Sequence, residues 1–106
     1  MDSTRQQPDC TLVDWRIMEA EDGACHLVGL SLETRKGRVS SAIALFDPLR
    51  RLVVTSSGRL YAIEGPPGTE WVAERVWAVW AKANGVPEYR DRTSHFCVEI
   101  GDATDH

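Results

Sequence analysis

Residues 65–68 (GPPG) divide the sequence into two parts of different character. Proline lacks a backbone N–H and fixes its own φ, so this run stops any regular strand or helix. Before it, apolar and polar residues alternate in short runs, which is the period of half-buried β-strands. After it, apolar residues recur at three- and four-residue spacing over residues 69–84, which predicts an amphipathic helix. The chain is therefore predicted to be rich in β-structure, with one helix near its C-terminal end.

Turn residues separate the alternating runs at intervals of about ten residues. Asp22-Gly23 and Ser57-Gly58 are typical of tight turns, and proline at position 48 ends a further run. The predicted strands are residues 12–18, 26–32, 39–46, 52–56, 59–64 and, after the helix, 95–100. In the first of them, Val13, Trp15 and Ile17 are expected to share one face. Gly29, in the middle of the second, predicts a bulge or a close backbone approach.

A meander of about five to six short strands predicts an α+β, β-rich fold. We expect a small antiparallel barrel or a strongly bent sheet, an SH3-like arrangement being one form of it. The one C-terminal helix would cap or cover this sheet, and the last strand would pair back onto an edge. An open sheet with the helix packed across it is the alternative, and the sequence hardly separates the two. Residues 11–101 are predicted to form a single domain, with flexible tails at 1–10 and 102–106.

Composition excludes several classes of protein. The 106 residues contain no run of about 20 apolar residues and begin without a signal-peptide core, so we expect a cytoplasmic protein that does not enter a membrane. Three scattered cysteines are too few for a disulfide framework and are expected to be thiols. The formal net charge of −4 counts against nucleic-acid binding as the main function, because phosphate recognition usually needs a basic surface.

Chemically reactive groups are sparse and poorly arranged for catalysis. Cys25 and His26 are neighbours on a predicted strand, so their side chains point to opposite faces and cannot easily meet. Adding His95 and Cys97 gives four zinc-type ligands, but their spacing matches no compact metal-binding motif. The sequence therefore predicts no enzyme, no metal site and no cofactor.

Tryptophan is concentrated in the predicted helix. Trp71, Trp77 and Trp80 lie within ten residues, and the angle of about 100° per residue prevents all three from sharing one narrow stripe. Trp80 and Val76 are expected to face the sheet, which leaves Trp71 or Trp77 partly exposed. Tryptophan is enriched at binding hot spots. The residues predicted to bind a protein partner are Trp71, Trp77, Arg75 and Tyr61.

Basic residues gather at the predicted turns. They are Arg35, Lys36, Arg38, Arg50, Arg51 and Arg59. Alternate hairpin tips of a meander lie at one end, so some of these side chains could form a patch that binds nucleic acid beside Tyr61. The competing explanation is that charged turns and strand ends prevent edge-to-edge aggregation.

Two segments carry a resemblance to small uncharacterised bacterial and prophage-type proteins. Residues 37–43 (GRVSSAI), Asp47 and residues 54–61 (VTSSGRLY) are similar to a GRxSSxI…D…VxTSSGRxY pattern in such proteins. The resemblance covers about a quarter of the chain and brings no site residues. It implies a small accessory protein of bacteria, their phages or mobile elements.

Together these features predict a small non-catalytic protein-interaction module. The most specific version of this prediction is an inhibitor or adaptor, encoded by a phage or mobile element, that acts on a bacterial protein complex such as a defence system. The alternative is a small-barrel nucleic-acid-binding protein that uses the turn arginines. A protein partner is expected in the first case and nucleic acid in the second, and a homodimer is compatible with either.

Overall fold

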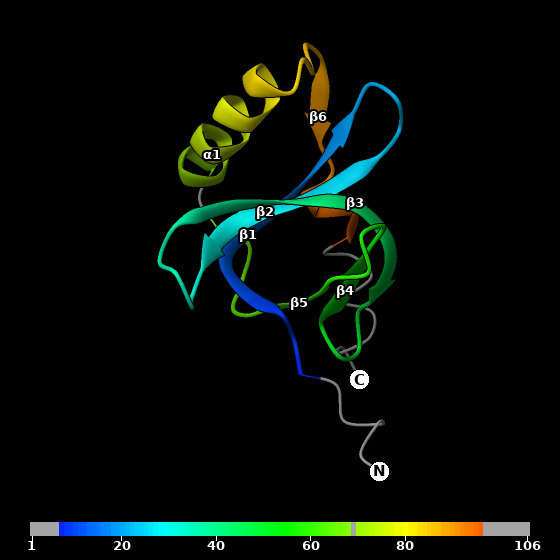
Figure 1. Cartoon of the computed structure of the whole chain (residues 1–106), viewed down its shortest axis with the longest axis vertical. Helices are drawn as coiled ribbons and strands as arrows, with labels where there is room; N and C mark the ends of the chain where they lie inside the picture. The colour runs from blue at the N-terminus through cyan, green and yellow to red at the C-terminus, as the bar shows by residue number, and fades with distance from the viewer. Residues whose placement is uncertain (1–6, 69, 97–106) are drawn as a thin grey trace.

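The computed structural model describes residues 7–68 and 70–96, which form a six-stranded mixed sheet with a helix packed against it (Figure 1). The elements in chain order are β1 (Cys10–Ala20), β2 (Cys25–Ser31), β3 (Gly37–Asp47), β4 (Leu52–Thr55), β5 (Leu60–Ile63), α1 (Glu70–Ala83) and β6 (Tyr89–Asp91). The β-rich α+β class is therefore confirmed. The first five predicted strands and the helix are all present, with ends shifted by a few residues.

Strand β1 is the centre of the sheet because it pairs with three other strands. Antiparallel ladders join β1 to β2, β2 to β3, β3 to β4 and β4 to β5. Strand β5 then pairs in parallel with the beginning of β1, where Cys10 lies opposite Tyr61. Strand β6 pairs with the end of β1, where Met18 lies opposite Asp91. The series of pairings that begins at β1 and passes through β2, β3, β4 and β5 therefore ends at β1 again.

A bulge in the middle of β1 changes which side chains face inward. Asp14 has a φ of 51°, and the register against β2 shifts between Val13 and Arg16. An extra residue in one strand reverses the alternation beyond it. Leu12 therefore shares the buried face with Trp15 and Ile17, and the expectation that Val13 does so is wrong.

Gly29 of β2 lies against this bulge, as its position in the run predicted. A Cβ atom at Gly29 would be 2.9 Å from the carbonyl oxygen of Val13 and 3.1 Å from Cα of Trp15. Real Cβ atoms do not approach a backbone so closely. The predicted close approach of the backbone is confirmed.

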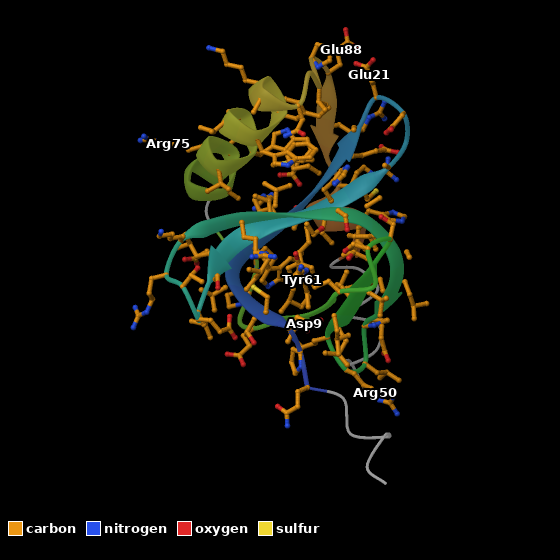
Figure 2. All side chains as sticks on the ribbon, viewed as in Figure 1. Asp9, Glu21, Arg50, Tyr61, Arg75 and Glu88 are labelled. Carbon is orange, nitrogen blue, oxygen red and sulfur yellow. The ribbon has the colours of Figure 1, made fainter. Side chains whose placement is uncertain are left out.

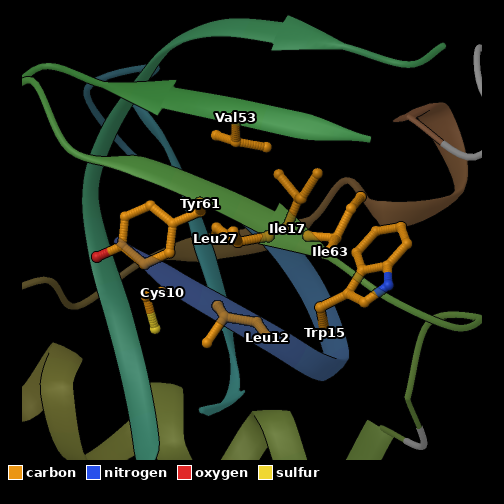
Figure 3. Packing of buried hydrophobic residues seen from close by; sticks show 8 residues of the cluster. All are labelled: Cys10, Leu12, Trp15, Ile17, Leu27, Val53, Tyr61 and Ile63. Atoms are coloured by element: carbon orange, nitrogen blue, oxygen red, sulfur yellow. The ribbon is translucent and has the colours of Figure 1, made fainter. Parts of the chain in front are cut away.

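Two apolar layers hold the fold together. The first lies between the strands and contains Cys10, Leu12, Trp15, Ile17, Leu27, Val53, Tyr61 and Ile63. The ring of Tyr61 and the indole of Trp15 lie at opposite ends of this cluster (Figure 3). The second layer lies between α1 and the other face of the sheet and contains Met18, Val28, Ala73, Trp77 and Ala81. The two layers use opposite faces of β1 and β2, as the alternation of side chains along a strand requires.

Three predictions about the two ends of the fold need correction. Asp9 and Cys10, predicted to end a tail, belong to the fold: the backbone N–H of Leu60 donates to the Asp9 carboxylate at 2.8 Å, and Cys10 begins β1. Strand β6 (Tyr89–Asp91) lies in a segment where no strand was predicted. Residues 93–96 form a helical turn rather than the start of a last strand, and the predicted strand residues 97–100 lie outside the described residues.

Candidate functional site

Two of the aromatic residues predicted to contact a partner are core residues. Tyr61 is 2% exposed and Trp77 is 0% exposed, so neither ring offers a surface to another protein. Ala73 and Ala81 lie one turn before and after Trp77 on the same helix stripe, and their small side chains leave room for the indole against the sheet. The prediction that Trp77 and Tyr61 bind a partner is therefore wrong. The side chain of Trp71 lies outside the described residues.

The rings of Trp77, Trp80 and His26 form an aromatic cluster under α1. Trp77 and Trp80 stack with ring centroids 4.9 Å apart, and the ring of His26 lies 5.0 Å from that of Trp80. Nδ1 of His26 lies 2.9 Å from the carbonyl oxygen of Ser40, which fixes the imidazole in place. Trp80 and Val76 both pack against the sheet, as their spacing predicted. The cluster is part of the packing between helix and sheet.

A groove beside this cluster, between α1 and the beginning of β3, is the best candidate for a functional surface. We call it the α1–β3 groove. It has a volume of about 480 Å³ and is lined by Gly37, Arg38, Val39, Arg75, Val76, Val79 and Trp80. Val79 is 73% exposed, so the groove presents an apolar side chain to solvent.

Basic residues border this groove. Arg38 and Arg75 are among its described lining residues, none of which is acidic, although Arg75 already takes part in another interaction and the charge of Glu33 acts on Arg38. Nε of Arg38 donates to the hydroxyl of Tyr61 at 3.1 Å, and the guanidinium lies 5.7 Å from the centroid of that ring. The exposed residues Arg35 and Lys36 come immediately before the strand that forms one wall. In a chain with a formal net charge of −4, this is a local concentration of positive charge around an apolar floor.

The structure brings together two residues that the sequence suggested for different reasons. Arg75 was predicted to bind a protein partner, and Arg38 was predicted to bind nucleic acid. Both line the same groove, because α1 packs across the face of β1, β2 and β3. Val39 and Val79 were not singled out, since a partly exposed valine leaves no recognisable mark in a sequence.

The basic turn residues are divided among three turns: Arg35, Lys36 and Arg38 at the β2–β3 turn, Arg50 and Arg51 between β3 and β4, and Arg59 between β4 and β5. Arg50 lies at the opposite end of the molecule from Arg75 of the α1–β3 groove (Figure 2). Arg51 donates to the carbonyl oxygens of Ile63 and Gly65, so its guanidinium stabilises the start of the loop after β5. Arg59 is exposed in the separate turn between β4 and β5.

A second hollow lies between the β1–β2 turn and β6. Glu21 and Glu88, which are labelled in Figure 2, are among its lining residues. Its volume is about 360 Å³ and its lining is mostly charged. Glu19 forms ion pairs of 3.6 Å with both Arg90 and Arg92, so the opposite charges largely satisfy one another. These ion pairs join β6 to β1, and this structural role accounts for the charged residues around the hollow.

The described cysteines show no sign of activation. Cys10 is buried and donates to the hydroxyl of Ser31 at 3.6 Å. Burial raises the pKa of the Cys25 thiol, and the neighbouring charge of Glu19 raises it further. A thiol with a raised pKa is a poorer nucleophile at neutral pH. Within residues 7–68 and 70–96, no group of three or more histidine, cysteine or acidic residues is placed to hold a metal ion.

Comparisons with protein-family models, with curated proteins and with solved structures give no match to this chain. None of the helical segments in the described part of the chain has the length and apolar character needed to cross a bilayer.

Proposed function

We propose that this protein is a small non-catalytic interaction module that binds an acidic segment of a partner protein in the α1–β3 groove. The observation that carries the proposal is the combination of an apolar floor, containing the 73% exposed Val79, with lining arginines. Exposed apolar surface bordered by charge is typical of protein-binding sites. An inhibitor or adaptor of a larger protein complex is the form of this function that suits so small a protein.

The rest of the molecule supports this proposal as scaffold. Because the ladders return to β1, we infer that β1–β5 form a small barrel around the first apolar layer. Helices and strands held by such a core keep a groove between them rigid, which lowers the entropy cost of binding. The distribution of the turn arginines gives no comparable support to nucleic-acid binding.

A display library of random peptides, selected on the purified protein, tests the proposal. We expect enriched peptides to combine acidic and apolar residues. Val79→Glu should weaken their binding about tenfold or more, equivalent to about 1.4 kcal/mol. The new carboxylate would lie beside the lining arginines and would repel an acidic peptide. Because Val79 is mostly exposed, the variant should fold normally.

Leu49→Glu is the matched control. Leu49 is also 73% exposed, but it lies in the turn between β3 and β4. We expect it to leave peptide binding unchanged. If no peptide is enriched, or if Val79→Glu and Leu49→Glu have equal effects on affinity, the α1–β3 groove is not the binding site.

A further inference from the structure

Strand β3 has a neighbour on both sides only along its second half. Its ladder with β2 extends from Gly37 to Ala42, whereas its ladder with β4 begins at Ile43 and ends at Asp47. No described strand pairs with the other edge of residues 37–41. The carbonyl oxygens of Ser40 and Ser41 already lie within hydrogen-bond distance of the His26 ring and the Ser40 hydroxyl. The remaining backbone groups along that edge, mainly those of residues 37–39, can accept another strand.

This edge opens into the α1–β3 groove. Gly37, Arg38 and Val39 are consecutive residues, and all three line the groove. Successive side chains of a strand point to opposite faces. A hollow that touches three residues in succession therefore reaches the strand along its edge and does not lie on one face alone.

The helix supplies the opposite wall at a suitable length. Residues 75–80 of α1 rise about 7.5 Å, and residues 37–39 of β3 extend about 6.6 Å. An extended segment with about three residues between these walls could bond to β3 on one side and place an apolar side chain against Val79 on the other. A helix placed in the same position would leave the polar groups of the β3 edge without partners.

We propose that the acidic partner segment binds as an extended strand that is added to the edge of β3. This inference rests on the proposed function, and it specifies how the partner is held. Main-chain hydrogen bonds to residues 37–41 would supply affinity, and alternate side chains would contact the groove. Carboxylates of the segment would lie near the basic residues at the start of β3, which are Arg35, Lys36 and Arg38.

Charge argues against a second copy of this chain as the occupant. Pairing two β3 edges would bring Arg38 of one copy, with Arg35 and Lys36 before it, close to the same cations of the other. Like charges brought together across strands are unfavourable. An acidic partner has the complementary charge.

Two measurements with a peptide enriched on the wild-type protein test this mode of binding. In a scan of backbone N-methylation, we expect loss of affinity at every second peptide residue and little change at the residues between. In amide hydrogen exchange, we expect alternate amides of residues 37–41 to exchange rapidly in the unbound protein and to slow about tenfold or more when the peptide is bound. The edge-facing amides are the ones that gain a partner.

Several outcomes would overturn the inference. Loss of affinity at every successive N-methylated residue would indicate a helical ligand. Protection of residues 37–41 in the unbound, monomeric protein would show that another segment of this chain already occupies the edge. Protection that appears only as the protein dimerises, followed by native mass spectrometry, would identify a second copy as the occupant. Binding that Val79→Glu weakens without any protection in β3 would keep the proposed function and reject strand addition.

Discussion

The side chain of Val76 in α1 lies directly over Gly37, the first residue of β3. A Cβ atom at Gly37 would be 2.5 Å from Cγ2 of Val76, so a residue with any side chain would push the helix away from the strand. We expect Gly37→Ala to lower the free energy of unfolding by about 1–3 kcal/mol in urea denaturation. In a Val76→Ala background the same change should cost much less. Equal costs in both backgrounds would show that the two residues do not interact.

The bulge at Asp14 predicts an unusual preference for glycine within a strand. Its φ of 51° is unfavourable for residues with a Cβ atom. Asp14→Gly should therefore be more stable than Asp14→Ala by about 1 kcal/mol, measured by thermal or urea unfolding. At the neighbouring Val13 the order should be reversed, because glycine weakens an ordinary strand position. The same order at both positions would contradict the bulge.

The hydroxyl of Tyr61 connects the core to the α1–β3 groove through Arg38. Tyr61→Phe removes this hydrogen bond and keeps the ring, so we expect a loss of about 0.5–1.5 kcal/mol of stability. In an Arg38→Met background the same change should cost less, since the bond is already absent. An unchanged cost in that background would mean that Arg38 is not the partner of the hydroxyl.

Ionisation of Asp91 should make the free energy of unfolding depend on pH in the acidic range. Burial alone would raise the pKa of Asp91, but hydrogen bonds from Arg16 and Thr93 outweigh it and hold the pKa below its ordinary value of 3.8. The Nε–H of Arg16 donates to its carboxylate at 2.7 Å. A lowered pKa in the folded state adds stability above pH 3.8, and this contribution is lost as the pH falls through the folded pKa.

The measurement is urea unfolding between about pH 2 and pH 6 for the wild type and for Asp91→Asn. The Asp91 side chain is 31% exposed, so we expect the contribution to be about 1 kcal/mol or less. The difference between the two proteins should shrink as the pH falls. A difference that is constant across this range would assign the effect of the substitution to packing and not to ionisation.

Nucleic-acid binding should be weak at any salt concentration. Arg51 is bonded to backbone carbonyls, and the other basic turn residues are divided among three turns, so few phosphates could be contacted at once. We expect a titration of labelled single-stranded DNA, followed by fluorescence anisotropy, to show no salt-dependent binding at low ionic strength. Salt-dependent binding that is lost in a double variant of Arg35→Glu and Lys36→Glu would restore the nucleic-acid alternative.

Patterns of alternation and turn residues were enough to predict most of the strands and the helix, since each depends on nearby residues. The bulge at Asp14 could not be predicted this way, because a single backbone dihedral reverses the inward face without changing the run of residue types. Strand β6 was missed because all three of its residues are exposed, so they carry no apolar alternation. The predicted last strand began at residue 95, but residues 95 and 96 belong to a helical turn.

The site was harder to predict than the fold. Large aromatic residues fill cores and also dominate interfaces, so the number of tryptophans in α1 could not show that Trp77 is buried. Arg38 and Arg75 are 37 residues apart in the sequence. Only the packing of α1 on the sheet places them along one groove, and that packing depends on contacts such as the one between Gly37 and Val76.

The three partners of β1 determine when the protein can finish folding during its synthesis. The first strand can form its hairpin with β2 early, because the two are joined by a short turn. Its remaining partners, Leu60–Ile63 and Tyr89–Asp91, leave the ribosome much later. Until then Trp15 and Ile17 lack core neighbours such as Tyr61 and Ile63. Their apolar side chains stay exposed on the nascent chain, where they are open to non-native contacts. The native fold is therefore completed only when nearly all of the chain described in this structure has emerged.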